Sequence, residues 1–460
     1  MSPHLPTVDQ LNRLAKTVMQ RHRVNYEQAL TILGGFHLHL VCLVASIRRP
    51  QYQAALLTAV NVGKRAFLGG VTVQLPPDVK CVLPGWFDQP LNAVVHELGG
   101  QVVSVRPAAH KTVWIGFSGA AQPSDLVLIA DGWRGGFVPA GLAAPFPETD
   151  GFALGGVFAA GLVVSRAFAE VAGLALGGCD EPFGLSLWRL DLPWTDENAR
   201  GPALSLLPAR LWLLGLGHLG QAYLWTLGLL PFASDSNPML FLQDFDHITS
   251  GNWSAGMLCE EGVTGELKTR ACAAWIERRG FITRLIERPF DAHTRVGTDE
   301  PKIALCGFDN VAGRRVLEDA KFHLIVECGL GSSFDFFDRL MLHTFPGASK
   351  RPEEVWLETA QPDVVDFDAS LFGAELADGE CGVLLDELTR KPISASFVGA
   401  AASALVVAEL LRGLHGGQRY ELILLHLRAN GSLRTVEKAE LYQQRHAANS
   451  KLRPAASSSP

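Results

Sequence analysis

The stretch that decides the fold runs from Leu211 to Gln221 and reads LWLLGLGHLGQ. An apolar run of strand length ends in Gly215-x-Gly217-x-x-Gly220, and residues 222–230 are again apolar. This order predicts a buried strand, a tight turn and a helix. Gly215 would permit the turn, Gly217 would let backbone amides approach a phosphate, and Gly220 would allow close helix–strand packing. The helix N-terminus would add oriented N–H groups that favour an anion.

Beyond this turn the chain alternates between strand and helix signals, which predicts a parallel, doubly wound α/β sheet. Strands are expected at 210–214, 239–243, 302–306 and 323–328, helices at 218–230, 265–280, 311–320 and 396–412, and a final strand pair around 420–436. Residues 332–393 show no clear periodicity and are predicted to be a long loop region, which in a compact domain is usually either functional or a wrong assignment of elements.

Two similar segments indicate that the chain has two related halves. Gly156 to Val164 reads GVFAAGLVV and Gly399 to Val407 reads GAAASALVV. Each predicts a small-residue helix that another element can approach closely, and their spacing favours a duplication. The alternative is that Ala-rich helices align easily without being related.

The predicted domains are residues 1–200, which include a connector, and residues 201–445. The first half has no intact Gly-x-Gly-x-x-Gly and no Asp-x-Asp pair, so it is predicted to be a degenerate, inactive version of the second. Its strand or short-helix candidates are 54–60, 65–75, 112–119 and 126–130. The polar tail 446–460 is expected to be disordered.

Composition narrows the class of protein. With 460 residues and 48% hydrophobic content, the chain can bury two substantial cores. The net charge of −7 is mild and no basic stripe is present, which argues against a nucleic-acid partner. No apolar run approaches the length of a membrane span, and the first 30 residues lack a signal-peptide core. The protein is expected to be cytoplasmic.

The eight cysteines are scattered and no two form a Cys-x-x-Cys pair. This pattern argues against a disulfide framework and against a structural zinc site. Cys42, Cys306 and Cys328 lie in apolar runs and are expected to be small buried residues.

In motif order the second half resembles the ThiF/MoeB superfamily of ubiquitin-activating-type enzymes, over residues 205 to 440. In that superfamily a glycine turn is followed by Asp-x-Asp, by Ser-Asn-Leu-x-Arg-Gln, by a lysine and by Asp-Asn. The counterparts here are Asp244-Phe245-Asp246, the segment from Ser250 to Gly256, Lys268 and Asp309-Asn310. The implied fold is a Rossmann-like adenylation domain, and the implied cofactors are ATP and Mg²⁺.

The resemblance implies a role for each of these residues. Asp244 would accept hydrogen bonds from the ribose hydroxyls, although a turn carboxylate is the plain alternative. Lys268 would bring a cation to the triphosphate, although an isolated helix lysine is usually only solvated. Asp309 would bind Mg²⁺, or cap the helix that begins near Val311, or do both. Asn252 and Asn310 would assist in positioning the nucleotide.

One departure from the superfamily pattern is plain. The arginine of the Asn-x-x-Arg motif falls on Ala255, and the following glutamine falls on Gly256. Another cation would have to face the phosphates. The candidates are Arg314 and Arg315 from the same half and Arg21 and Arg23 from the first half, and the sequence does not choose among them.

The resemblance also implies a nucleophilic cysteine in the crossover loop, predicted at 332–393, and Cys381 lies there. A thiolate could take an acyl-adenylate to a thioester. The neighbouring carboxylates Asp378, Glu380 and Asp386 would raise the pKa of the thiol, so activation would have to come from elsewhere. The alternative is an incidental loop cysteine, with Cys259 and Cys328 as the next candidates.

The predicted function is ATP-dependent activation of a ubiquitin-like protein and its transfer to a conjugating enzyme. The chain would be a homodimer or an intrachain pseudo-dimer, with no nucleic-acid or membrane partner. Within the superfamily it resembles most the bacterial ubiquitin-activating proteins (Bil- or Bub-type) of antiphage operons. The alternatives are a sulfur-carrier adenylyltransferase, which the missing zinc cysteines disfavour, and a non-catalytic scaffold. A dehydrogenase is the weakest reading.

Overall fold

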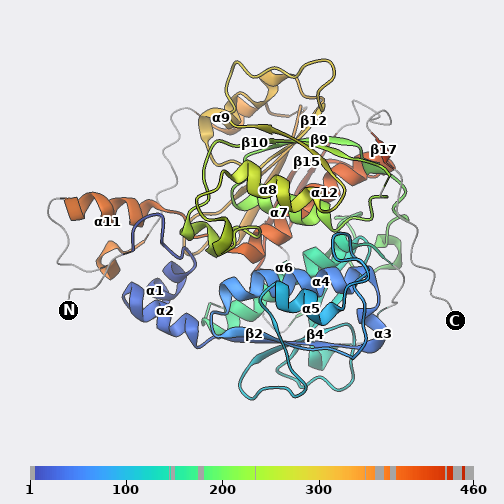
Figure 1. Ribbon diagram of the computed structural model, residues 1–460, viewed down its shortest axis with the longest axis vertical. Coiled ribbons are helices and arrows are strands. Elements are labelled where there is room, and N and C mark those ends of the chain that lie inside the picture. Colours follow the sequence, from blue (N-terminus) through green and yellow to red (C-terminus); the bar gives the residue numbers. More distant parts are fainter. Residues whose placement is uncertain are drawn as a thin grey trace.

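The structure, a computed structural model, consists of two α/β sheets that enclose two layers of helices (Figure 1). It describes residues 6–143, 146, 151–174, 181–233, 235–347, 349–357, 367–372, 380–429, 432–438 and 448–450. Both sheets are mixed but mostly parallel where they carry the first strands of each half, so the predicted fold class is confirmed.

The first half builds a seven-stranded sheet in the order β3-β2-β1-β4-β5-β6-β7. Its strands are β1 (His37–Cys42), β2 (Gly70–Gln74), β3 (Gln101–Val102), β4 (Lys111–Ile115), β5 (Leu126–Asp131), β6 (Arg134–Pro139) and β7 (Phe183–Ser186). Its helices are α1 (Ala15–His22), α2 (Tyr26–Gly34), α3 (Val44–Ile47), α4 (Pro50–Ala66), α5 (Leu91–Glu97) and α6 (Ala153–Val171). Strands β6 and β7 are antiparallel to their neighbours.

The second half builds an eight-stranded sheet in the order β11-β10-β9-β12-β13-β14-β15-β16. Its strands are β9 (Arg210–Leu214), β10 (Met239–Gln243), β11 (Ile282–Ile286), β12 (Ile303–Cys306), β13 (Leu324–Leu330), β14 (Arg339–Phe345), β15 (Tyr420–His426) and β16 (Arg434–Glu437). Its helices are α7 (His218–Gly228), α8 (Lys268–Glu277), α9 (Val311–Arg315), α10 (Pro352–Val355), α11 (Glu380–Arg390) and α12 (Ser396–His415). The last three strands are antiparallel.

The two halves share one topology. The order of the first seven strands of the second half, taken in chain order, is the same as that of the first half. In each half a helix leads from the first strand to the second (α4 and α7), another follows the second strand (α5 and α8), and a long helix leads into the seventh (α6 and α12). A shared order of seven strands is stronger support for two related halves than the similarity of two small-residue segments.

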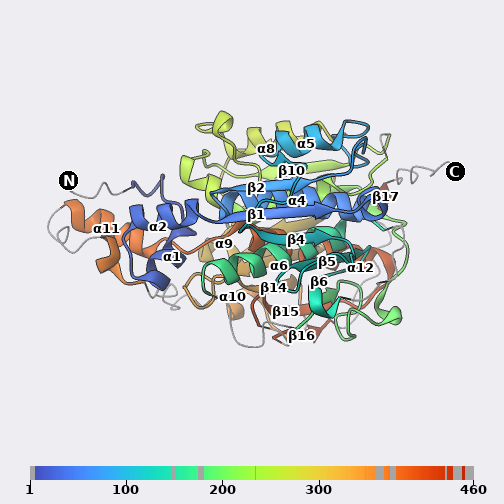
Figure 2. The same cartoon turned by 90° about the horizontal axis from the view of Figure 1, so that it is seen from below.

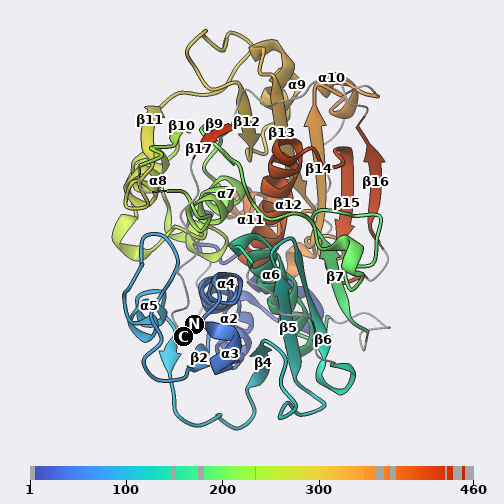
Figure 3. The same ribbon diagram turned by 90° about the vertical axis from the view of Figure 1, so that its right-hand side faces the viewer.

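Helices from both halves meet in the centre of the molecule (Figure 3). Glycine allows this close approach: a Cβ at Gly161 of α6 would lie 2.7 Å from the backbone nitrogen of Ala401 in α12. Within the first half, a Cβ at Gly156 would lie only 1.9 Å from the carbonyl oxygen of Gln51. One continuous core therefore includes apolar side chains of both halves.

The sequence prediction on membrane spans needs correction. Helices α6 and α12 are long and apolar enough to cross a membrane by length and composition. In the structure, 83% and 94% of their most apolar windows are buried, because the two helices pack on each other between the sheets.

Two further predictions were wrong in part. The region 332–393 is not a continuous loop, because it contains β14, α10 and α11. Strand β14 was missed because His343 and Thr344 are polar yet both buried, which breaks the alternation of polar and apolar residues. In the tail, β17 (Ala448–Ser450) pairs antiparallel with β8 (Leu207–Pro208), and the rest of 446–460 lies outside the described residues.

The first helices of the chain lie at one end of the molecule, beside α11 of the second half (Figure 2). Lys16 of α1 makes this contact specific, because its ammonium donates hydrogen bonds to the carbonyl oxygens of Leu388, Thr389 and Lys391 at the end of α11. The N-terminal segment of the first half is thus tied to the helix that carries Cys381.

Candidate functional site

The glycine turn lies at the point where strand order reverses, between β9 and β12, which is where open α/β sheets bind ligands. Each glycine has a distinct environment. Gly215 has a φ of +82° and its Cα faces Phe308 at the end of β12. A Cβ at Gly220 would lie 1.9 Å from the carbonyl oxygen of Gly215, whereas a Cβ at Gly217 would meet nothing within 4 Å. The turn therefore needs Gly215 and Gly220 for its own geometry and leaves Gly217 open.

Asp244 fixes the shape of this turn. Its carboxylate accepts hydrogen bonds from the backbone nitrogen of Leu216 at 2.6 Å and from that of Asp246 at 2.8 Å. Asp244 therefore acts as a turn carboxylate, which was the alternative to a ribose contact. Its hydrogen bond to Leu216 places it next to Gly217 in the turn.

Lys268 begins α8 and its side chain is largely buried, with 10% exposed. Its ammonium lies 2.7 Å from the carboxylate of Asp246, which is half exposed. A second contact, from the backbone nitrogen of Lys268 to the carbonyl oxygen of Asp246, holds the start of α8 against the end of β10. The cation is therefore held at the edge of the sheet that carries the glycine turn.

Asp309 and Asn310 follow β12, and Asn310 supplies the helix cap that the sequence had offered for Asp309. Asn310 is the N-cap of α9, since its side-chain oxygen accepts hydrogen bonds from the backbone nitrogens of Ala312 and Gly313. Asp309 does not cap this helix, and its side chain is exposed. A carboxylate at this place is suited to a divalent cation that takes its other ligands from phosphates and water. Nowhere among the residues that the structure describes do three or more His, Cys, Asp or Glu side chains gather to hold a metal ion.

An arginine of the N-terminal segment, which sequence reasoning missed, feels the charge of Asp309. Arg13 comes from the segment before α1, and the carboxylate of Asp309 counteracts the effect of burial, which lowers the pKa of Arg13. Arg13 also interacts with His218, the first residue of α7, and burial together with Arg13 lowers the pKa of that histidine to about 3. No local sequence pattern marks Arg13, because its neighbours in space lie hundreds of residues away.

The four arginines proposed from the sequence are engaged elsewhere. Arg23 is exposed and pairs with Asp368, and the side chain of Arg21 lies beside Gly173. Arg314 bonds to the carbonyl oxygen of Phe308 and pairs with the buried carboxylate of Glu327. Arg315 donates to backbone carbonyls near α10. Arg314 feels the charge of Asp309, but its guanidinium is already committed to Glu327.

The N-terminal segment is docked on the counterpart of the Ser-Asn-Leu-x-Arg-Gln motif. The carbonyl oxygen of Asp9 accepts a hydrogen bond from the backbone nitrogen of Gly251, and the backbone nitrogen of Arg13 donates to the hydroxyl of Ser254. Asn252 uses its side-chain oxygen to accept from the backbone nitrogen of Thr249. Asn252 therefore shapes the segment against which Arg13 rests.

The cysteine predictions have different outcomes. Cys381 is the second residue of α11, not part of an irregular loop as expected, and its side chain lies outside the described residues. The fallback cysteines Cys259 and Cys328 are buried, and burial raises the pKa of each thiol. A buried thiol with a raised pKa is a poor nucleophile. Cys42 and Cys306 are buried as expected.

These features define a class: a protein of two related α/β halves in which the second half carries a glycine turn flanked by carboxylates and cations. The chain belongs to the bacterial E1-like BilD family. The model of the BilD N-terminal domain matches residues 37–187, and that of the BilD C-terminal domain matches residues 207–417. A curated relative, the bacterial E1-like protein BilD of Collimonas sp. (strain OK412), is 35% identical over 417 residues, which is 90% of this chain and 90% of that protein. The resemblance inferred from motif order is therefore confirmed.

Solved structures match at a lower level. E. coli MccB with MccA-N7isoASN is 14% identical over 51% of this chain, with a TM-score of 0.35. E. coli MccB with ATP is 13% identical over 51% of this chain, with a TM-score of 0.33, and PaaA is 10% identical over 50%, with a TM-score of 0.32. The chain spans 65%, 65% and 63% of the lengths of these three structures. Similarity at this level says nothing about ligand or substrate.

Proposed function

We propose that this E1-like chain adenylates the C-terminal carboxylate of a ubiquitin-like protein with ATP and then accepts the acyl group on Cys381. One observation carries the proposal: the glycine turn, Asp244, Lys268 and Asp309 share one edge of the second sheet, and Arg13 is brought to Asp309 from the other half. A scaffold would have no need to gather these groups. The family name of the curated relative, E1-like, agrees with this chemistry.

The site residues fit a nucleoside triphosphate. The open space at Gly217 and the backbone amides at the start of α7 form a phosphate cradle. Asp244 lies where a ribose would come next, at the end of the adjacent strand. Lys268 and Arg13 supply two cations to a group that carries several negative charges.

Magnesium fits Asp309, whose exposed carboxylate is a hard oxygen ligand. Bound there with the phosphates, the ion would neutralise charge as pyrophosphate leaves. The residues themselves would hold the triphosphate, orient its α-phosphorus and place cations where charge develops.

The two steps balance without a further reactant. In the first, a carboxylate oxygen of the ubiquitin-like protein bonds to the α-phosphorus, the bond to the bridging oxygen breaks, and pyrophosphate departs. In the second, the Cys381 thiolate bonds to the acyl carbon and AMP departs as the leaving group. The acyl group then passes to a conjugating-type enzyme in the same manner.

The test is a non-reducing gel of the protein with Mg·ATP and a candidate ubiquitin-like partner, beside Cys381→Ala and Cys259→Ala as a matched control. An ATP-dependent, thiol-sensitive adduct that is lost in Cys381→Ala and kept in Cys259→Ala supports both steps. Partner-dependent ATP–pyrophosphate exchange without an adduct would retain adenylation and remove Cys381. This is also the result expected of a sulfur-carrier adenylyltransferase. Absence of both activities would favour a scaffold.

A further inference from the structure

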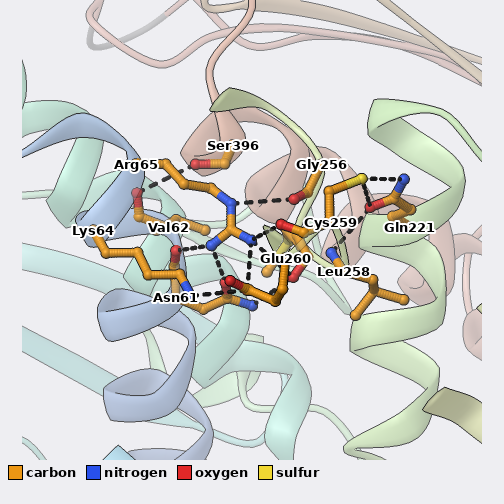
Figure 4. Close-up of polar contacts among 11 residues, drawn as sticks. Asn61, Val62, Lys64, Arg65, Gln221, Gly256, Leu258, Cys259, Glu260 and Ser396 are labelled. Carbon is orange, nitrogen blue, oxygen red and sulfur yellow. Dashed lines mark hydrogen bonds and ion pairs between the residues drawn. The ribbon is translucent and has the colours of Figure 1, made fainter. Parts of the chain in front are cut away.

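Arg65 of α4, in the first half, is completely buried and reaches into the second half (Figure 4). Its Nε donates to the carbonyl oxygen of Gly256 at 3.1 Å, and its terminal nitrogens donate to those of Met257 at 3.4 Å and Cys259 at 3.1 Å. It also pairs with the carboxylate of Glu260 at 3.0 Å. One side chain thus holds the whole turn from Gly256 to Glu260, which we call the 256–260 turn.

Two neighbours complete the hold on this turn. Asn61, one helical turn earlier on α4, donates to the carbonyl oxygen of Met257 at 3.1 Å and accepts from Arg65. Lys64 pairs with the same carboxylate oxygen of Glu260 as Arg65 does, at 2.8 Å. Arg65 has no freedom to reach a phosphate, because its nitrogens already face carbonyl and carboxylate oxygens. Its role differs from that of Arg13, whose charge faces Asp309.

From the opposite side, Gln221 of α7 holds the same turn and joins it to the glycine turn. Its side-chain oxygen accepts from the backbone nitrogen of Leu258 at 3.0 Å (Figure 4). Its side-chain nitrogen donates to the carbonyl oxygen of Leu216 at 3.0 Å. Leu216 is the residue between the first two glycines of the turn, and its backbone nitrogen donates to Asp244. The contacts therefore run without a break from α4 of the first half to the loop that would face the phosphates.

The departure from the superfamily pattern has its explanation here. A Cβ at Gly256 would lie 2.7 Å from the side-chain oxygen of Gln221 and 2.8 Å from the sulfur of Cys259. A side chain at this position would displace Gln221 and disturb the hydrogen bonds that it makes. Ala255 is buried as well. The turn is held by side chains from α4 and α7 in place of its own.

We propose that Arg65 is a positioning residue, through which the first half sets the geometry of the nucleotide-binding loop by way of the 256–260 turn and Gln221. The inference rests on the proposed function for its effect on ATP. Its structural part, control of the Leu258 and Leu216 amides by Arg65, can be measured without ATP.

The experiment compares Arg65→Lys, Arg65→Gln and the control Thr58→Val in the full chain. Thr58 lies on the same helix, is buried, and accepts a hydrogen bond from the indole of Trp225 across the same boundary at 2.9 Å, but it does not contact the 256–260 turn. Hydrogen exchange is followed on peptides that contain Leu216 and Leu258, together with the Kd for Mg·ATP and the KM and kcat of pyrophosphate exchange.

In Arg65→Lys and Arg65→Gln, exchange at Leu258 and Leu216 should accelerate, and the Kd and KM for ATP should rise about tenfold or more, the scale of one charge-assisted hydrogen bond. Lysine keeps the charge but not the planar fork, so Arg65→Lys should rescue only part of the loss. Thr58→Val should change neither amide. If a folded Arg65→Lys protein exchanges both amides at the wild-type rate, the proposal is overturned. If the wild-type chain binds no ATP, the proposed function fails, and the amide rates still decide the role of Arg65.

Discussion

Replacing Gly220 by alanine should destabilise the protein, whereas the same change at Gly217 should leave its stability nearly intact and weaken ATP binding. The two positions lie in one turn but differ in what a methyl group would meet. At Gly220 the added carbon lies 1.9 Å from the carbonyl oxygen of Gly215 and 2.9 Å from its carbonyl carbon. Backbone atoms must then move by about 1 Å or more to reach van der Waals contact.

The magnitude follows from two opposed effects. Overpacking costs about 1–3 kcal/mol, and alanine in a helix gains about 1 kcal/mol over glycine. Gly220→Ala should therefore lose up to about 2 kcal/mol in the free energy of unfolding, more if the turn cannot relax. At Gly217, which precedes α7, an added Cβ would meet nothing within 4 Å, so alanine avoids the overpacking cost and as an N-cap costs about a few tenths of a kcal/mol.

Urea unfolding of both variants gives the difference in stability, and titration with Mg·ATP gives the difference in affinity. A phosphate seated on the turn would collide with the methyl group at position 217, so we expect about a tenfold rise in Kd, or 1.4 kcal/mol. Equal destabilisation by both changes, or unchanged ATP affinity in Gly217→Ala, would refute this account of the turn.

Three further results are expected. Arg13→Ala should lower kcat of pyrophosphate exchange at least about tenfold with little loss of stability, because an exposed carboxylate such as Asp309 tolerates the loss of its partner; a steady-state assay beside a thermal melt checks this, and an unchanged kcat would contradict it. Gly161→Ala should lower the free energy of unfolding by about 1–3 kcal/mol more than Gly34→Ala, because both replace a helical glycine but only the Cβ at Gly161 meets another element. Equal denaturation midpoints would show that α6 and α12 can separate freely. The pKa of His218 is lowered to about 3, below its unfolded value near 6.5, so the folded state binds fewer protons between these values. Its contribution is complete above pH 6.5 and is lost as pH falls towards 3, by up to about 1.4 kcal/mol per pH unit; His218→Gln should show a shallower loss of stability in that window, and parallel curves would assign the acid sensitivity to other groups.

The second half could be predicted well because its signals are local. Strand β9, the glycine turn and α7 follow one another in a single stretch, and β10 and β12 end in the expected carboxylates. Strand β14 was not predicted because His343 pairs with Glu327 inside the sheet, so its polar residue is buried and does not indicate an exposed segment. The sequence also could not show which of Asp309 and Asn310 caps α9, because an Asp or an Asn side chain can cap a helix equally well.

The first half shows where local reasoning ends. Its lack of a glycine turn was readable, but Arg13 and Arg65 act on partners that chain order places far away. Neither residue stands in a distinctive pattern, since each is one basic residue near or within an ordinary helix. Their importance depends on the packing of α4 and of the N-terminal segment against the second half, and only the assembled topology brings the partners together.

The docking of the segment that carries Arg13 on the residues around Ser254 has a consequence for the time at which the protein matures. During translation the N-terminal segment leaves the ribosome early and must wait, without its binding surface, until the residues around Ser254 and then Asp309 have been made. Domains tend to fold as units in the order of their synthesis, but here the earliest segment is among the last to dock. A nascent chain thus contains its glycine turn before the N-terminal segment has docked, and the site is complete only once both halves are present.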